Sequence, residues 1–170
     1  MVVALFENLH YNGRNYSSKE VPYMHFTVLK ATEASLPALA EMAGCIWHSC
    51  TKEELIAEFR TMLPNPEQGL FLAVSDDAPV GFAQCGLRHD YVEGTSSSPV
   101  GYLEGIYVRP EYRGMGCARL LLSECEKWAK DRGCPEFASD CELDNTDSLG
   151  FHLNVGFSEV NRIICFVKKL

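Results

Sequence analysis

The fold of this chain is decided by one segment, Ile106-Tyr107-Val108-Arg109-Pro110-Glu111-Tyr112-Arg113-Gly114-Met115-Gly116-Cys117-Ala118-Arg119-Leu120-Leu121-Leu122. Its first residues indicate a strand and its last residues a helix, and a short turn with two glycines joins them. Glycines let the backbone bend tightly and approach a ligand without intervening side chains. The helix begins with unpaired N–H groups and a partial positive charge, which suit a diphosphate. The segment therefore predicts an anion site.

The spacing of these glycines argues against two common nucleotide sites. A P-loop requires Lys-Ser or Lys-Thr directly after its last glycine, and Gly116 is followed by Cys117. A dinucleotide fingerprint requires a third small residue where this chain has Arg119. An ordinary glycine-rich turn between a strand and a helix is the remaining alternative to an anion site.

Composition limits the class of protein. The 170 residues suffice for one domain with a real core. Hydrophobic residues make up 46%, but no run approaches the 18 or so that span a bilayer, and no basic region marks a signal peptide, so we expect no membrane contact. The net charge of −8 disfavours nucleic acid as a partner and fits a cationic ligand or simple solubility.

The cysteines indicate neither disulfides nor a metal site. None of the eight belongs to a Cys-x-x-Cys pair, and the five histidines do not join them at zinc-site spacing. Most fall at apolar positions, as small core side chains do. We therefore expect no metal, reduced thiols and a cytoplasmic protein.

The chain divides at Met24. Residues 1–23 are rich in turn formers and lack clear periodicity, which predicts an N-terminal appendage, although an extra strand is the alternative. From Met24 the pattern predicts one domain, 24–170. Strands are expected near 26–29, 70–74, 80–87, 100–109, 137–139 and 163–167, and helices near 35–47, 51–62, 117–133 and 146–155. This order predicts an α/β fold with a single mixed central sheet flanked by helices.

Several motifs resemble one enzyme family. Arg113-Gly114-Met115-Gly116-Cys117-Ala118 resembles the pyrophosphate-binding motif of the GCN5-related N-acetyltransferase superfamily. Five further motifs are similar to the chromosomal-type aminoglycoside 6′-N-acetyltransferases: Tyr91-Val92-Glu93-Gly94, Ser97-Ser98-Pro99-Val100, Leu103-Glu104-Gly105-Ile106-Tyr107-Val108, Phe137-Ala138-Ser139-Asp140 and Asn145-Thr146.

The resemblance implies a GCN5-related N-acetyltransferase fold and transfer of an acetyl group from acetyl-CoA to an aminoglycoside antibiotic, conferring resistance. An acetyltransferase for another small amine, such as a polyamine or amino sugar, and a non-catalytic acyl-CoA-binding module are the alternatives. No cysteine aligns as an acyl carrier, so direct transfer is expected.

The resemblance also implies a set of cofactor contacts. Backbone groups of the strand would hold the pantetheine arm, the glycine loop would hold the pyrophosphate, and Asn145 would touch the cofactor or only cap a helix. The residues concerned are Ile106, Tyr107, Val108, Arg113, Gly114, Met115, Gly116, Cys117, Ala118, Arg119 and Asn145.

The implied substrate site is acidic and aromatic. Glu104 would orient the amine and assist its deprotonation, and Asp140 would be a second acidic contact. The alternatives are an exposed strand carboxylate for Glu104 and a strand-end or cap residue for Asp140. Trp47 and Tyr91 would contact the substrate, with a core position as the alternative for Trp47. Asn161 stands where the family often has a further glutamate.

His152 occupies a position where many superfamily members have a tyrosine that protonates the departing thiolate. It could act as that acid or only pack against the thiolate. The resemblance finally implies a homodimer, for which the apolar strand expected at 163–167 would supply an interface unless it completes the monomer's own sheet.

Overall fold

A five-stranded sheet forms the centre of the molecule, of which the computed structural model describes residues 24–170. The expected appendage, 1–23, lies outside the described residues. The strands run in the order β1 (Thr27–Lys30), β2 (Gln68–Ser75), β3 (Ala78–Arg88), β4 (Val100–Val108) and β5 (Phe137–Ser139). Neighbours pair antiparallel as far as β4, and β4 pairs with β5 in parallel. The predicted mixed sheet is confirmed.

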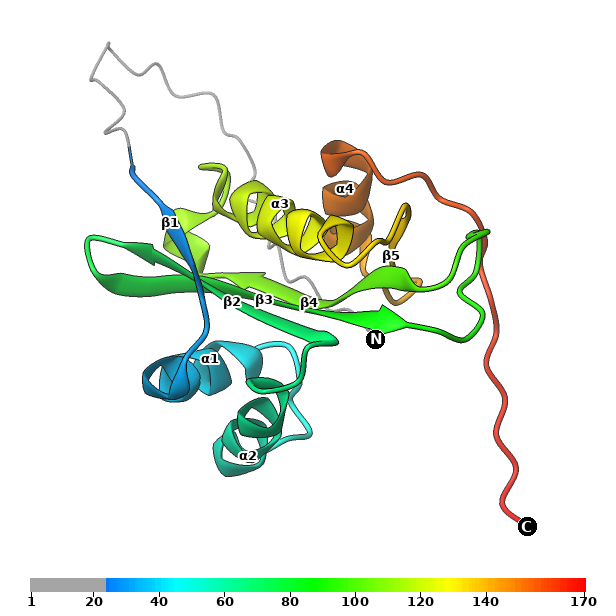
Figure 1. Ribbon diagram of the computed structural model, residues 1–170, viewed down its shortest axis with the longest axis horizontal. Coiled ribbons are helices and arrows are strands. Elements are labelled where there is room, and N and C mark those ends of the chain that lie inside the picture. Colours follow the sequence, from blue (N-terminus) through cyan, green and yellow to red (C-terminus); the bar gives the residue numbers. More distant parts are fainter. Residues whose placement is uncertain (1–23) are drawn as a thin grey trace.

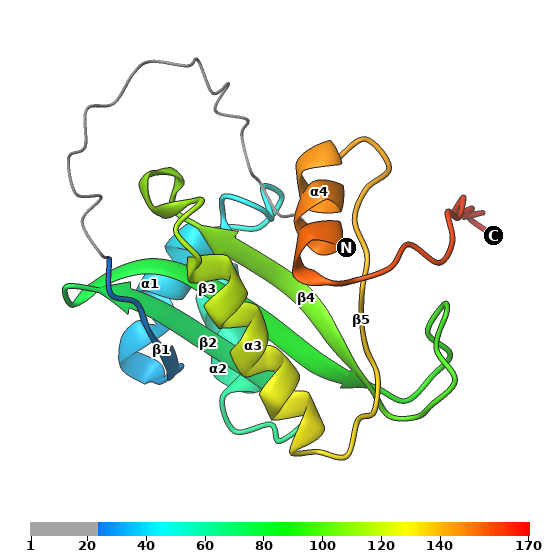
Figure 2. The ribbon, with the colours of Figure 1, turned by 90° about the horizontal axis from the view of Figure 1, so that it is seen from above.

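Helices cover both faces of this sheet (Figure 1). On one face lie α1 (Leu36–Ala43), which follows a 3₁₀ turn at Glu33–Ser35, and α2 (Lys52–Met62). On the other lie α3 (Cys117–Lys130), reached through a second 3₁₀ turn at Pro110–Tyr112, and α4 (Thr146–Val155). Seen from above, α3 crosses the sheet diagonally and α4 stands beside β4 and β5 (Figure 2).

Each helical layer encloses its own apolar core. Leu103, Ile106 and Val108 of β4 pack with α3, whereas Tyr107 packs with α1 and α2 on the opposite face. Side chains of a strand alternate between faces, and one buried strand therefore serves both cores. This explains why β4 reads as a nearly continuous apolar run rather than as an alternating pattern.

Local signals in the sequence account for where several elements begin. The Thr51 hydroxyl accepts a hydrogen bond from the Glu54 amide at 3.2 Å, and the two residues form a capping box at the start of α2. Asp76 and Asp77 both have positive φ, at 48° and 62°, which suits the tight turn between β2 and β3. β5 and α4 have the bounds expected from the sequence.

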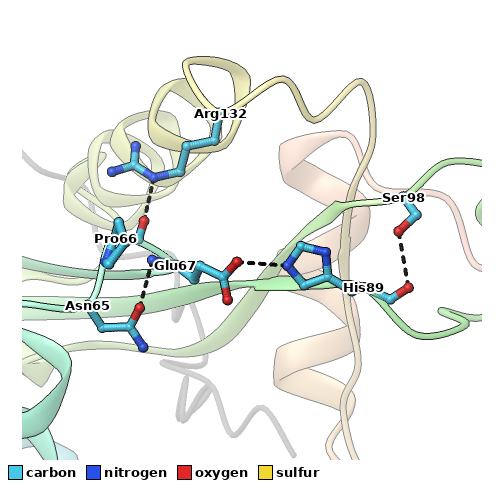
Figure 3. Close-up of polar contacts among 6 residues, drawn as sticks. All are labelled: Asn65, Pro66, Glu67, His89, Ser98 and Arg132. Atoms are coloured by element: carbon cyan, nitrogen blue, oxygen red, sulfur yellow. Dashed lines mark hydrogen bonds and ion pairs between the residues drawn. The ribbon is translucent and has the colours of Figure 1, made fainter.

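A chain of polar contacts fastens the connection between β3 and β4 to the rest of the fold (Figure 3). His89 Nε2 lies 2.9 Å from Glu67 Oε1, and the His89 carbonyl accepts a hydrogen bond from Ser98 Oγ at 3.1 Å. Beside them, Arg132 Nε at the end of α3 donates to the Pro66 carbonyl at 2.7 Å. Both ends of the segment that carries Tyr91 are thus held in place.

Two predicted elements are wrong in part or in whole. The helix expected over 35–47 ends at Ala43. The strand expected at 163–167 is not formed: residues 157–170 contain no helix or strand, and the Phe166 and Val167 side chains are 91% and 96% exposed. The apolar pattern reports only local preference, whereas a strand exists through hydrogen bonds to a neighbour, and this segment pairs with no strand among the described residues.

Candidate active site

The glycine loop leaves the N-terminus of α3 open. Gly114 and Gly116 have φ of +73° and +90°, a region that favours glycine, and a Cβ built on either would meet nothing within 4 Å. Gly116 is the N-cap of α3, and no side chain caps that end of the helix. Backbone N–H groups there are consequently available to an anion, and the loop fits a diphosphate.

The side chains around this loop divide between core and surface. Met115 is 48% exposed, whereas Cys117 is 1% exposed and Ala118 packs against the core. Arg113 Nε donates to the Val108 carbonyl at 2.9 Å, and Arg119 Nη2 donates to the Asn154 carbonyl at 3.0 Å. Both guanidinium groups are therefore held beside the loop by backbone oxygens.

Cys117 does not have the properties of a nucleophile. Burial raises the pKa of its thiol to about 11, so the thiol stays protonated at neutral pH. Asn145, in turn, caps α4, because its Oδ1 accepts a hydrogen bond from the Ser148 amide at 3.0 Å. The alternative reading of Asn145 as a cap is thus confirmed, and its contact with a cofactor stays a prediction.

Strands β4 and β5 separate halfway along β4. They pair only at Gly101, Tyr102 and Leu103, which face Phe137, Ala138 and Ser139. From Glu104 onward β4 has β3 on one side and, among the described residues, no strand on the other. The Ile106, Tyr107 and Val108 side chains are buried, so β4 presents mainly its backbone groups to this fork. An extended ligand with amide groups fits here, and it would run from the glycine loop toward Glu104.

Glu104 lies on a β-bulge at the base of the fork. Gln84 of β3 faces Gly105 and the next residue, Cys85, faces Leu103, which leaves Glu104 as the extra residue on β4. Bulges of this kind redirect a side chain and are frequent next to active sites. Glu104 points toward the α1 and α2 face, where it lines a cavity of about 280 Å³ together with Trp47, Cys50, Leu55, Glu58 and Gln84.

Arg88 binds Glu104 in a two-pronged ion pair. Its Nη2 donates to Oε2 at 2.8 Å and its Nε to Oε1 at 3.1 Å, while the guanidinium carbon lies 3.3 Å from the centre of the Tyr102 ring. Asp140 interacts with Tyr102 and with Arg88. Burial, and then the charge of Asp140, raise the pKa of Tyr102 well above its usual range. The structure thus brings both predicted acids, Glu104 and Asp140, together around Arg88.

Trp47 belongs to the core and to the cavity at once. Its ring makes edge contacts with Phe59 and Phe82, at 6.3 Å and 6.0 Å between ring centres. A Cβ at Gly105 would lie 2.7 Å from Trp47 Cζ2, so the indole can rest against β4 only because that residue is glycine. The two readings of Trp47 are therefore compatible.

Tyr91 and Asn161 meet at a different acid, Glu93. The Tyr91 hydroxyl donates to Glu93 Oε2 at 3.1 Å, and Asn161 Nδ2 donates to Oε1 at 2.9 Å. Tyr91 is 79% exposed. Asn161 therefore joins the segment after α4 to the connection between β3 and β4. Its amide group binds the Glu93 carboxylate and does not line the cavity at Glu104.

His152 is buried in α4 and hydrogen-bonded through both ring nitrogens. Its Nδ1 lies 2.7 Å from the Ser148 carbonyl and its Nε2 lies 2.9 Å from Ser139 Oγ. Burial lowers the pKa of His152 below its ordinary value, against opposing effects of Ser148 and Asp140. His152 is 8% exposed.

Sequence reasoning missed three residues of this region: Arg88, Glu93 and Ser139. Arg88 is a charge at the end of an apolar strand, which is a weak signal on its own. Its pairing with Glu104 depends on the register of β3 against β4, which no periodicity in the sequence reveals. The contact of Ser139 with His152 depends on the packing of α4 beside β5, which the sequence does not reveal.

Two broader observations concern the described residues. No helix there is both long and apolar enough to cross a membrane. The eight cysteines all lie in this part of the chain and are free thiols. Cys85, Cys117, Cys125 and Cys134 are buried, as expected of small core side chains.

Comparison with known proteins supports a specific family. The model of the acetyltransferase (GNAT) family matches residues 36–157. A protein of Stenotrophomonas maltophilia named aminoglycoside N(6′)-acetyltransferase type 1 is 40% identical over 141 residues, covering 82% of this chain and 91% of that protein. Among solved structures, aminoglycoside N-acetyltransferase AAC(6′)-Iy in complex with CoA has a TM-score of 0.83 at 33% identity and covers 86% of this chain and 97% of its own.

A second structure of AAC(6′)-Iy contains a bisubstrate analogue, CoA-S-monomethyl-acetylneamine, and has a TM-score of 0.82 at 33% identity, with 86% of this chain and 99% of that chain covered. The family match spans more than half of the chain and includes the glycine loop, the fork and α4. This chain belongs to the acetyltransferase (GNAT) family.

Proposed function

We propose that this protein is an aminoglycoside 6′-N-acetyltransferase that uses acetyl-CoA and confers resistance to aminoglycosides. One arrangement carries the proposal: the fork between β4 and β5 joins an open anion loop at Gly114–Gly116 to an acidic cavity at Glu104. The relatives named for this activity, which match most of the chain, support the choice of substrate.

The cofactor side of the proposal rests on backbone groups. The N-terminus of α3 and the loop residues Arg113 to Arg119 would hold the pyrophosphate, and the edge of β4 at Ile106, Tyr107 and Val108 would hold the pantetheine arm. Asn145 would contact the same ligand from the start of α4. Acetyl-CoA, when bound, supplies an activated acetyl thioester.

The substrate side rests on carboxylates. Glu104 would bind and orient the ammonium group that is to be acetylated and would assist its deprotonation, with Asp140 as a second acidic contact. The substrate ammonium group would replace the Arg88 guanidinium, whose Nη2 lies 2.8 Å from Glu104 Oε2. Trp47 would bound the cavity, and Tyr91 with Asn161 would contact outlying sugar rings. Holding both substrates in one geometry would supply much of the rate.

Direct transfer follows from the thiols of this chain. Cys117 at the loop is buried with a raised pKa, and Cys50 at the cavity aligns with no acyl carrier of the family. The test is an assay of thiol release from acetyl-CoA with kanamycin-type aminoglycosides, followed by mass spectrometry and NMR of the product. We expect acetylation at the 6′-amine and intersecting initial-rate lines; parallel lines would contradict direct transfer.

The same assay separates the alternatives. Spermidine and glucosamine replace the aminoglycoside as probes of a polyamine or amino-sugar substrate. If either is acetylated and no aminoglycoside is, the enzyme class holds and the substrate assignment is wrong. If acetyl-CoA binds in calorimetry but no amine gives thiol release, the chain is an acyl-CoA-binding module.

We further propose a homodimer working in the reducing cytoplasm. Support comes from the segment 157–170, in which Ile163, Ile164 and Phe166 are 68%, 81% and 91% exposed, and from β5, which lies at the edge of the sheet. The free thiols fit a reducing compartment. Light scattering should give twice the 19.0 kDa monomer mass; the monomer mass at micromolar concentration would contradict the dimer and leave the enzyme assignment intact.

A further inference from the structure

We propose that Ser139 and His152 form a proton relay at the fork, in which the Ser139 hydroxyl takes a proton from the attacking nitrogen and returns it to the departing sulfur, with His152 holding it in between. The inference rests on the proposed function and adds Ser139 as a catalytic residue. His152 acts only through Ser139 and is a positioning residue in this scheme.

The hydrogen bonds determine which atom carries each proton. A carbonyl oxygen only accepts, so the contact of 2.7 Å with the Ser148 carbonyl places a proton on His152 Nδ1. In the neutral ring Nε2 then has a lone pair, and at 2.9 Å it accepts the hydrogen bond of the Ser139 hydroxyl. The contact of Ser139 Oγ with the Leu103 carbonyl is longer, at 3.4 Å. The oxygen of Ser139 keeps lone pairs for an incoming N–H group.

Burial explains why the histidine needs the serine. His152 is 8% exposed, its two nitrogens are engaged, and the Phe151 and Phe157 rings flank it at 5.5 Å and 5.2 Å between ring centres. Ser139 is only partly buried. The hydroxyl is therefore the end of the pair that a ligand in the fork can reach.

The position of Ser139 matches where proton transfer is needed. It is the last residue of β5 and faces Leu103 in the last register pair before the strands separate. Glu104, the next residue on β4, turns to the opposite face. An acetyl group that links a ligand on the glycine loop to an amine held by Glu104 has to lie at this point of the fork.

The transfer balances without a further reactant. The neutral amine forms its bond to the acetyl carbon, the carbon–sulfur bond breaks with its electron pair going to sulfur, and the nitrogen gives up one proton. Ser139 Oγ receives this proton as its own passes to His152 Nε2. The reverse steps deliver a proton to sulfur and leave amide, thiol and a neutral His152.

The surroundings of His152 suit this cycle. Burial keeps the ring neutral at the start, because it lowers the pKa of His152, and Asp140 opposes that effect and would stabilise the transient cation. The Ser148 carbonyl keeps its hydrogen bond in both charge states. The Cys141 thiol interacts with Ser148, and burial raises the pKa of this thiol.

The test compares Ser139→Ala with Ser139→Thr, which retains a hydroxyl, and with Ser123→Ala, which removes a serine hydroxyl from an exposed position of α3. In the full-length enzyme at saturating substrates we expect Ser139→Ala to lower kcat about 100-fold, within the range for general acid–base groups, with both KM values within about twofold. Ser139→Thr should retain at least about a tenth of kcat, and Ser123→Ala should match the wild type.

Two further readouts separate chemistry from structure. The wild-type kcat should fall as pH drops through the pKa of His152, and this acidic limb should be absent in Ser139→Ala. In ¹⁵N NMR of the ligand-free protein, His152 should be the Nδ1–H tautomer, with the Nε2 signal shifted in Ser139→Ala. A wild-type kcat and acidic limb in Ser139→Ala, or the Nε2–H tautomer, would overturn the relay. Absence of any turnover by the wild type would instead count against the proposed function.

Discussion

The guanidinium of Arg88 and the carboxylate of Glu104 meet through two parallel hydrogen bonds, 2.8 Å from Nη2 to Oε2 and 3.1 Å from Nε to Oε1. Sixteen positions separate these residues in the sequence, and the pairing of β3 with β4 brings them together. The Arg88 guanidinium thus already binds the Glu104 carboxylate, which is the group that we propose binds a cationic substrate. The pair holds Glu104 in one orientation, and in the proposed function a substrate ammonium group would replace Arg88.

Replacing Glu104 should affect binding of cationic substrates more than folding. In Glu104→Gln the charge is lost while the shape is kept, and we expect kcat/KM for an aminoglycoside to fall at least about tenfold, because a charge-assisted hydrogen bond becomes a neutral one. Glu33→Gln is the matched control, since Glu33 forms an exposed ion pair with Arg60 at 3.2 Å. Equal kinetics of the two variants would contradict the assignment of Glu104.

The glycine loop has room for a methyl group, but its backbone conformation at Gly116 is strained for any other residue. Gly116→Ala places a Cβ in open space at φ +90°, and we expect a loss of about 1–2 kcal/mol in the free energy of unfolding from backbone strain. Its KM for acetyl-CoA should also rise. Gly150→Ala, inside α4 and equally free of contacts, should instead gain about 0.5–1 kcal/mol. Urea denaturation measures both; two changes of the same sign would refute this account.

The start of α2 should depend on the hydroxyl of Thr51. Thr51→Ala removes the acceptor of the first-turn amide, and we expect the free energy of unfolding to fall by about 1 kcal/mol. Thr51→Ser keeps the oxygen and should stay close to the wild type. The urea midpoints of the wild type, Thr51→Ala and Thr51→Ser test this prediction. If Thr51→Ser is as unstable as Thr51→Ala, the loss of stability comes from the missing methyl group and not from the hydroxyl.

Stability should decrease in mild acid because of His152. Burial lowers the pKa of His152 in the folded protein below its unfolded value of about 6.5, so the unfolded chain binds the proton more readily. Between the two pKa values stability therefore rises with pH, and the contribution of the neutral ring is lost as pH falls from about 7 toward the folded-state pKa. His152→Gln should show a shallower dependence between pH 7 and about pH 5 in urea denaturation. An unchanged slope would show that another group controls this range.

Much of the fold could be predicted because its signals are local. The strand–glycine–helix segment ending in α3, the capping box at Thr51 and the short strand at Phe137–Ser139 each depend on residues close together in the sequence, where period, turn chemistry and end groups restrict the backbone. The same reasoning placed Glu104 on the strand beside the glycine loop, and the resemblance of short motifs indicated the family.

Tertiary structure decided what depends on pairing between distant segments. The strand expected at 163–167 fails because apolar side chains favour extended backbone but cannot supply the neighbour that a strand requires. Arg88 meets Glu104 only through the register of β3 and β4 with its bulge, and Ser139 meets His152 only because α4 packs beside β5. Periodicity in a sequence shows which face a residue takes on its own element, whereas hydrogen bonds between elements depend on register and packing, which are set by the whole core.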